Sequence, residues 1–313
     1  MSKRPNIILI LSDQHNAKVL GYKGHPDVKT PNLDRMASEG VSFENAITQN
    51  PICTPSRVCY FSGQYVHNHG YYGLSGPNPR GLPNLFGHFR KAGYRTSAIG
   101  KIHCPEYWIE DDTDLFHETC NCSIGGRSAE YESFLKKRGK LELEDHISLP
   151  EFGDRGLQSM EGRPSPLSFE ESQEGWAVNR TIQFIEECVN DGIPFFSHIS
   201  LPRPHQCTSP CKEFWDLYEG KELTLPPNAD YPMEGKSPLM IGNAKWWRTG
   251  NWALLEPKTF EAARLRKLRG YLGAVSQVDH AVGLILDYIR KKNIANNTIV
   301  IYASDHGDYA TEH

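Results

Sequence analysis

Five consecutive residues, Cys53-Thr54-Pro55-Ser56-Arg57, combine a thiol, a proline and an arginine in a way that packing alone does not require. Pro55 suits the first turn of a helix, where a missing N–H leaves no hydrogen bond unmade. Arg57 follows Cys53 by four residues, so its side chain can reach back along that turn. The start of a helix also favours an anion near residue 53. Two interpretations stay open at this point: a reactive group at a helix start, or a buried cysteine at an ordinary junction.

A second group of residues has the chemistry of a metal site. Asp13-Gln14 and Asp305-His306 would together supply two carboxylates, an amide and an imidazole. Oxygen ligands with one nitrogen suit hard divalent cations such as Ca²⁺, Mg²⁺ or Mn²⁺. Each aspartate taken alone is better explained as a helix cap. Taken together, and combined with a reactive residue 53, the set favours metal binding.

Basic side chains form a third group, which consists of Arg57, Lys101, His103 and His205. Such groups could hold a tetrahedral oxyanion and donate a proton to a leaving oxygen. A single histidine is more often structural, and we keep that interpretation for His67, His69 and His198. The Lys101-x-His103 pair is harder to explain as solvated surface, because it directly follows a strand.

Buried strands are needed to bring these groups together. Continuous apolar segments are typical of strands buried on both faces of a parallel sheet, and they occur at 5–11, 94–99, 194–201 and 298–303. Amphipathic helices alternate with them, at 82–91, at about 168–190 and along 265–289. The expected fold class is α/β, with a doubly wound, largely parallel central sheet and helices on both faces. The polar residues that follow the strands then converge at the carboxyl edge of the sheet.

The remaining segments are expected to belong to one catalytic domain that spans residues 1–313. Thr30 is expected to cap a helix that Pro31 opens, and a short strand at 41–47 leads the chain to Cys53. Periodicity fades at about 105–168 and again at 206–258, where we expect loop-rich insertions.

Composition narrows the class of protein. The 313 residues are 38% hydrophobic and 23% charged, with a net charge of −4, so no broad basic field is available for nucleic acid or an anionic membrane. The apolar run at 7–11 is too short for a membrane span or a signal-peptide core, which predicts a cytoplasmic protein. Eight cysteines in a chain of this length, without zinc-site spacing, are expected to be reduced thiols.

Several motifs, taken in order, resemble the type I sulfatase family within the alkaline phosphatase superfamily. The Cys53-x-Pro55-Ser56-Arg57 segment resembles the family's signature. The other matching segments are Pro5-Asn6-Ile7 to Asp13, Thr30-Pro31-Asn32-Leu33-Asp34, Gly63-Gln64-Tyr65, Gly93-Tyr94-x-Thr96, Gly100-Lys101-x-His103 and Ser304-Asp305-His306-Gly307. Together they extend over nearly the whole chain.

The resemblance implies a specific chemistry for residue 53. A dedicated formylglycine-generating enzyme would oxidise Cys53 to formylglycine, and one hydroxyl of the hydrated aldehyde would attack sulfur and release the alcohol. Loss of a proton from the other hydroxyl would expel sulfate and restore the aldehyde. The implied substrate is a sulfate ester, either a sulfated carbohydrate or an aryl sulfate.

The resemblance also implies roles for the surrounding residues. One divalent cation, with Ca²⁺ the first expectation and Mg²⁺ or Mn²⁺ the alternatives, would bind the formylglycine oxygen and the side chains of Asp13, Gln14, Asp305 and His306. Gln14 stands where many sulfatases have a second aspartate. Arg57 would steady residue 53, Lys101 and His205 would hold the sulfate, and His103 would contact the second hydroxyl.

Two other functions remain as alternatives. Phosphonate monoester hydrolases and phosphodiesterases share this scaffold and the modified residue, although the Lys101-x-His103 pair favours a sulfatase. An inactive fragment that binds sulfated ligands is the other alternative, because the smaller C-terminal subdomain expected for the family does not appear in this sequence. No pattern in the sequence indicates an oligomeric state.

Overall fold

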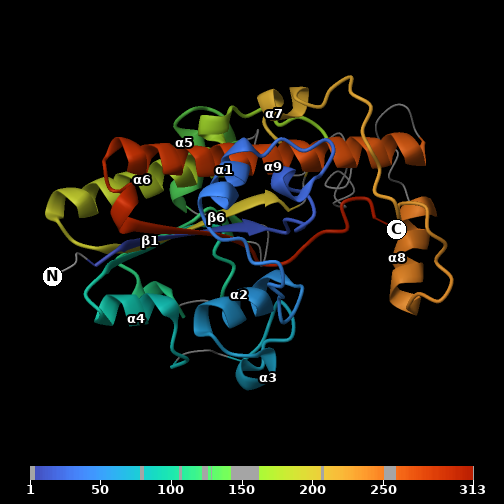
Figure 1. Cartoon of the computed structure of the whole chain (residues 1–313). Helices are drawn as coiled ribbons and strands as arrows, with labels where there is room; N and C mark the ends of the chain where they lie inside the picture. The colour runs from blue at the N-terminus through green and yellow to red at the C-terminus, as the bar shows by residue number, and fades with distance from the viewer. Residues whose placement is uncertain are drawn as a thin grey trace.

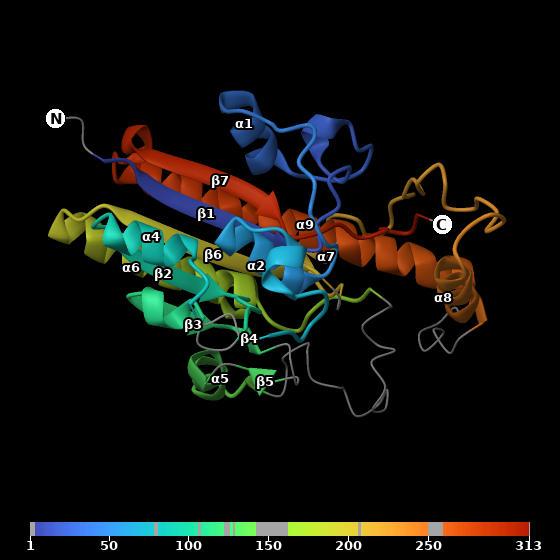
Figure 2. The same cartoon turned by 90° about the horizontal axis from the view of Figure 1, so that it is seen from below.

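A five-stranded parallel sheet forms the centre of the structure. The computed structural model describes residues 4–77, 81–105, 108–121, 126–127, 129–141, 162–205, 208–249 and 259–312. The strand order is β3-β2-β6-β1-β7 (Figure 2). The strands are β1 Asn6–Asp13, β2 Arg95–Gly100, β3 Leu115–Glu118, β6 Phe195–Pro204 and β7 Thr298–Ser304. Every pairing among them is parallel, which confirms the expected fold class.

Helices cover both faces of this sheet (Figure 1). One face carries α1 Pro31–Glu39, α6 Gln173–Asp191 and α9 Phe260–Lys291, and the other carries α2 Cys53–Ser62 and α4 Leu85–Lys91. The shorter helices are α3 Val66–His69, α5 Ala129–Lys136, α7 Lys212–Asp216 and α8 Pro238–Thr249. The 3₁₀ turns are η1 Gly21–Lys23, η2 Glu110–Asp112, η6 Phe169–Glu171 and η7 Ala295–Asn297. A short antiparallel pair joins β4 Cys120–Asn121 to β5 Gly126–Arg127.

Alternating side chains of β1 explain why two helical layers form. Ile8 and Ile10 are fully buried in the core that α6 and α9 share with the sheet. Leu9 points to the opposite core, where it meets Phe61 of α2 and Phe86 of α4. Because neighbouring side chains of a strand face opposite sides, an uninterrupted apolar strand must be covered twice.

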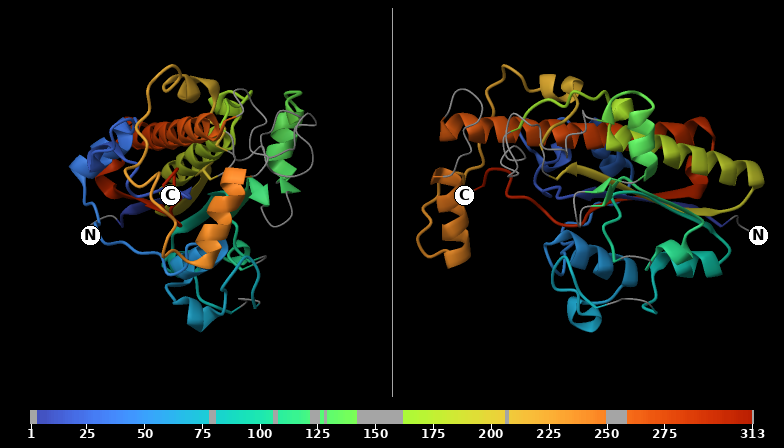
Figure 3. Two further views of the ribbon diagram at one scale, coloured as in Figure 1. Left: turned by 90° about the vertical axis from the view of Figure 1, so that its right-hand side faces the viewer. Right: turned by 180° about the vertical axis from the view of Figure 1, so that it is seen from behind.

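The ends of the molecule lie far apart along the sheet. The N-terminus is at the end where β1 begins, and the C-terminal end of the chain lies near α8, beyond the carboxyl edge of the sheet (Figures 1 and 3). Within the described ranges, no helix is long and apolar enough to cross a lipid bilayer.

Three local predictions differ from the structure. The segment at 41–47 has no strand, and its Val41, Phe43 and Ile47 side chains are 78%, 80% and 83% exposed, so nothing in the described part of the chain pairs with it. Within the predicted insertion at about 105–168, β3 joins the central sheet as an edge strand beside β2. Of the predicted insertion at 206–258, the described part includes α7 and α8.

Helix starts also differ slightly from expectation. The predicted helix at about 168–190 begins one turn later, because Ser168 and Glu171 close a capping box on η6 and Ser172 then caps α6. Pro31 does open α1, but the Thr30 hydroxyl makes no cap and donates instead to Asp34.

Candidate active site

The carboxyl edge of the sheet gathers the residues that the sequence singled out. Strands β1 and β7 end at Asp13 and Ser304, the latter just before Asp305-His306. The turn after β2 contributes Lys101 and His103, and the turn after β6 contributes His205. Helix α2 begins at Cys53 against this edge. Residues nearly 300 positions apart in the sequence therefore form one cluster.

Cys53 lies at the first residue of α2 and is 7% exposed. Its Sγ atom is 3.3 Å from Nε2 of His306 and 3.9 Å from Oδ1 of Asp13. Burial, followed by the negative charge of Asp13, raises the pKa of the Cys53 thiol to about 12. With these neighbours the group is a protonated thiol at neutral pH, which is a weak nucleophile.

Arg57 is fully buried one turn into α2 and orients both carboxylates of the cluster. Its Nε donates to Oδ2 of Asp305 at 2.9 Å, and Nη2 donates to Oδ2 of Asp13 at 3.0 Å. The rigid guanidinium fork thereby fixes the positions of two aspartates at the ends of separate strands, Asp13 in β1 and Asp305 just after β7. Nη1 donates to Ser200 Oγ at 2.9 Å and to the carbonyls of Lys101 and Ile102.

Four side chains have donor atoms close enough to share one metal ion. Ligand atoms of Asp13, Cys53, Asp305 and His306 all lie within 4.8 Å of one another, and all four residues are buried. Nδ1 of His306 lies 2.9 Å from the carbonyl of Gly307. If Nδ1 carries the proton, that bond leaves the Nε2 lone pair facing Asp13 Oδ1, 3.7 Å away. Two carboxylates and an imidazole fit a hard divalent cation.

Gln14 is held beside this cluster with a φ of 65°, a conformation that is uncommon for a residue other than glycine. Its backbone N–H donates to Oδ1 of Asp305 at 3.0 Å. The side-chain Nε2 donates to the carboxylate of Asp308. The amide nitrogen is thus engaged by Asp308, and a role for Gln14 as metal ligand stays a prediction.

Lys101 brings positive charge directly against the carboxylates. It is 1% exposed, and its Nζ lies 2.6 Å from Oδ2 of Asp13. Burial alone would raise the pKa of the Asp13 carboxyl. The charges of Lys101, His205 and Arg57 outweigh burial and hold that pKa well below its usual range. The Asp13 carboxylate is therefore ionised at neutral pH and available as a ligand.

His103 has one ring nitrogen that makes no hydrogen bond in the described structure. That nitrogen is Nδ1, and the residue is 8% exposed. Burial, and then the charges of Lys101 and Arg57, lower the pKa of His103 to about 3. A neutral, buried imidazole with one unpaired nitrogen is suited to bonding a group that enters the site.

The whole chain can now be compared with known proteins. A family model described as Sulfatase matches residues 5–313. The chain belongs to the sulfatase family. An arylsulfatase of Clostridium perfringens is 30% identical over 340 residues, which cover 99% of this chain and 64% of that protein. The chain thus spans less than two thirds of the length of this curated relative.

Solved structures with the same fold include proteins with different substrates. Phosphonate monoester hydrolase of Agrobacterium radiobacter has a TM-score of 0.73 at 21% identity, covering 99% of this chain and 64% of the other. A protein solved in complex with its substrate, D-glucosamine-2-N,6-O-disulfate, has a TM-score of 0.69 at 21% identity, covering 99% and 67%. At 21% identity, these structural similarities show only that this chain shares its fold with the two proteins.

Sequence reasoning missed several residues that support the site. Ser200 bonds Arg57 from within β6, and Ser56 donates to the Asp305 carbonyl at 2.6 Å. Asp308 bonds Gln14, and Glu118 at the end of β3 bonds the backbone of His103 at 3.2 Å. Ser56 and Asp308 lie within or beside recognised motifs. No sequence motif marks Ser200 or Glu118 as a site residue. They lie here only because β2 pairs with β6 and with β3.

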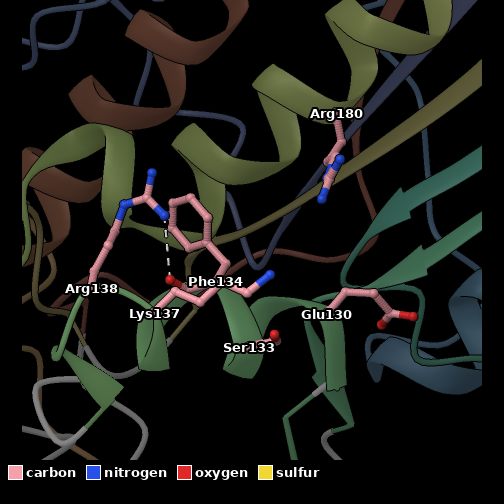
Figure 4. Close-up of a pocket in the computed structure, with 6 residues that line it drawn as sticks. All are labelled: Glu130, Ser133, Phe134, Lys137, Arg138 and Arg180. Carbon is pink, nitrogen blue, oxygen red and sulfur yellow. Dashed lines mark hydrogen bonds between the residues drawn. The ribbon is translucent and has the colours of Figure 1, made fainter.

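The protein also has a pocket that lies apart from the predicted site residues. It has a volume of about 470 Å³ and lies between α5 and α6 (Figure 4). Its lining residues are Glu130, Ser133, Phe134, Lys137, Arg138 and Arg180. None of the predicted site residues lines it.

The five cysteines whose side chains are described, 53, 59, 104, 188 and 211, are free thiols, as expected.

Proposed function

We propose that this protein hydrolyses sulfate esters, using a formylglycine made from Cys53 beside a bound divalent cation. The observation that carries the proposal is the position of Cys53 at a helix start, within 4.8 Å of the donor atoms of Asp13, Asp305 and His306. Membership of the sulfatase family supports the same reaction.

The metal would be held by Asp13, Asp305 and His306, with Gln14 as a further candidate. When bound, the cation would supply positive charge that favours ionisation of a coordinated hydroxyl group and polarises a sulfate oxygen. Ca²⁺ is the first expectation, because the carboxylate-rich donor set suits a hard ion. Arg57 would keep both carboxylates aimed at it, through the two bonds described above.

Formylglycine would provide a hydrated aldehyde with two hydroxyl groups, one to attack sulfur and one to permit release of sulfate. Lys101 and His205 would bind the sulfate oxygens and neutralise charge that grows in the transition state. His103 would accept a hydrogen bond from the second hydroxyl at Nδ1, the nitrogen that has no partner in the described structure, and so assist the elimination of sulfate. The alcohol leaves with a proton that Lys101 or His205 can donate.

A sulfated saccharide or an aryl sulfate is the proposed substrate class. One relative is named an arylsulfatase, and one fold neighbour was solved with a sulfated glucosamine as its substrate. A separate maturation enzyme would supply the oxidant that turns the Cys53 thiol into the aldehyde. The phosphonate alternative is not favoured, because its support here is likeness of fold at 21% identity. The predicted cytoplasmic location stays a prediction.

The test begins with the full-length protein from its native host. The mass of the peptide that carries residue 53 should match formylglycine or its hydrate, and turnover of an aryl sulfate should exceed that of an aryl phosphonate monoester. Cys53→Ala should abolish turnover. Cys59→Ala, in the same helix, is the matched control and should retain it. An unmodified Cys53, or a preference for the phosphonate, would contradict the proposal.

A further inference from the structure

The backbone that carries His103 leaves the sheet through two unusual conformations. Gly100 has a φ of 103°, and a Cβ there would lie 1.9 Å from the Ser200 carbonyl oxygen, so the position requires glycine. His103 itself has a φ of 47°. A left-handed conformation costs a residue other than glycine about 1–2 kcal/mol. The surrounding contacts must therefore hold His103 in place.

Two side chains hold this turn from opposite directions. Arg57 donates from Nη1 to the carbonyls of Lys101 and Ile102. Glu118 accepts the backbone N–H of His103 at Oε1, at 3.2 Å. Arg57 already has a role in orienting the metal-site carboxylates, whereas Glu118 has been given none so far.

Glu118 reaches the turn because of the sheet register. It is the last residue of β3 and lies opposite Gly100, the last residue of β2. The adjacent N–H of Thr119 donates to the Gly100 carbonyl at 3.0 Å, which fixes the end of β3 against the start of the turn. The carboxylate is therefore aimed at His103 from a regular element of the sheet and not from a loose loop.

We infer that Glu118 is a positioning residue, which holds the backbone of His103 so that the imidazole presents its unpaired nitrogen to the site. This inference rests on the proposed function, because it assigns to His103 the hydrogen bond to the second hydroxyl described there. Without the carboxylate, the His103 N–H loses a partner and the strained turn can relax. The imidazole would then spend less time in the productive position.

Substitution of Glu118 provides the kinetic test. Glu118→Ala in the full-length, matured and metal-loaded protein should lower kcat for an aryl sulfate by about ten- to a hundred-fold, as expected for a misplaced reacting group. KM should change much less, because Lys101 and His205 still bind the sulfate. Glu118→Gln keeps an oxygen acceptor and should restore most of kcat. Glu110→Gln, an exposed acid on neighbouring η2, is the control.

A double-mutant cycle tests whether Glu118 acts through His103. In a His103→Ala background, Glu118→Ala should cause little further loss, because the group that it positions is gone. Additive losses, a Glu118→Gln variant as slow as Glu118→Ala, or an unchanged kcat in Glu118→Ala would each overturn the inference.

A measurement that needs no turnover separates this inference from the proposed function. In histidine-labelled protein, the His103 imidazole resonance is assigned by its loss in His103→Ala. We expect that resonance to shift or broaden in Glu118→Ala and to stay in place in Glu118→Gln. An unchanged resonance in Glu118→Ala would overturn the positioning role. If the unsubstituted protein hydrolyses no sulfate ester, the proposed function fails, while this measurement still decides the role of Glu118.

Discussion

At the residue scale, the candidate site depends on two buried cations that neutralise two buried carboxylates. Arg57 bonds Asp13 and Asp305 at once, and Lys101 adds a second contact to Asp13. Both cations are almost completely buried, so their charges are little screened by water. Lys101 is the one that the proposed function assigns to the substrate.

Lys101→Ala should lower kcat/KM for a sulfate ester by about 10²-fold or more, because an oxyanion donor is lost from a buried site. The carboxylate of Asp13 keeps Arg57 as a partner, so the fold should persist. Steady-state kinetics on an aryl sulfate would measure the loss. Lys91→Ala, at the exposed end of α4, is the control, and normal activity of Lys101→Ala would show that the anion site is elsewhere.

At the element scale, α1 is anchored by a carboxylate from another helix. Asp279 of α9 accepts the backbone N–H groups of Asn32 and Leu33 at 3.0 and 2.7 Å. The Asn32 side chain adds a third bond at 2.8 Å. Asp279 thus takes the capping role that the sequence assigned to Thr30, and local sequence could not reveal this because the partner lies almost 250 residues away.

Asp279→Ala should lower the free energy of unfolding by about 1–3 kcal/mol at pH 5, since buried N–H donors of α1 lose their acceptor. Urea unfolding followed by circular dichroism would measure this difference. Asp287→Ala changes an exposed carboxylate on the same helix and should stay within about 0.5 kcal/mol of the natural protein. Equal effects of the two substitutions would contradict the anchoring role.

The same residue predicts a dependence of stability on pH. Burial raises the pKa of Asp279 to about 6, despite the opposing bonds from Leu33 and Asn32. A folded-state pKa above the unfolded value of about 3.9 means that the folded protein binds this proton more tightly. The resulting stabilisation is complete below about pH 4 and is lost as pH rises through about 6. The unfolding free energy of Asp279→Asn relative to the natural protein should therefore rise between pH 4 and 7, and a constant difference would contradict this.

At the scale of the whole molecule, a buried ion pair joins three elements near the site. Arg203 at the end of β6 pairs with Glu174 of α6 and donates to the Ser209 carbonyl. Gln277 of α9 donates to the same Glu174 carboxylate at 2.9 Å. The end of β6 that leads to His205 is thereby fixed to both long helices.

Glu174→Ala should destabilise the protein by about 3–5 kcal/mol, because it leaves the buried Arg203 charge without its carboxylate. Equilibrium unfolding in urea would measure the change. Glu187→Ala, on the exposed side of the same helix, should have little effect. A loss below about 1 kcal/mol in Glu174→Ala would show that water or another group satisfies Arg203.

Sequence predicted the features that depend on long regular patterns. Uninterrupted apolar runs predicted β1, β6 and β7, and the polar residues that follow them do converge. The segment at 41–47 was wrongly predicted as a strand, because β-branched and aromatic residues form a strand only where a partner pairs with them. The position of Glu118 was not predictable, since it depends on β3 pairing with β2 in one register. Tertiary contacts decided each of these cases.

The pairing of β1 with β7 sets the order of events during synthesis. Asp13 and Asp305 are brought together only when β1 pairs with β7, so a growing chain has no assembled site until residue 305 has emerged. At about 5–20 residues per second, Cys53 precedes Asp305 by roughly 13–50 s. In the finished fold Cys53 is 7% exposed, so its thiol is largely inaccessible to solvent once the site has assembled. Cys53 is thus more accessible to solvent before the fold is complete than afterwards.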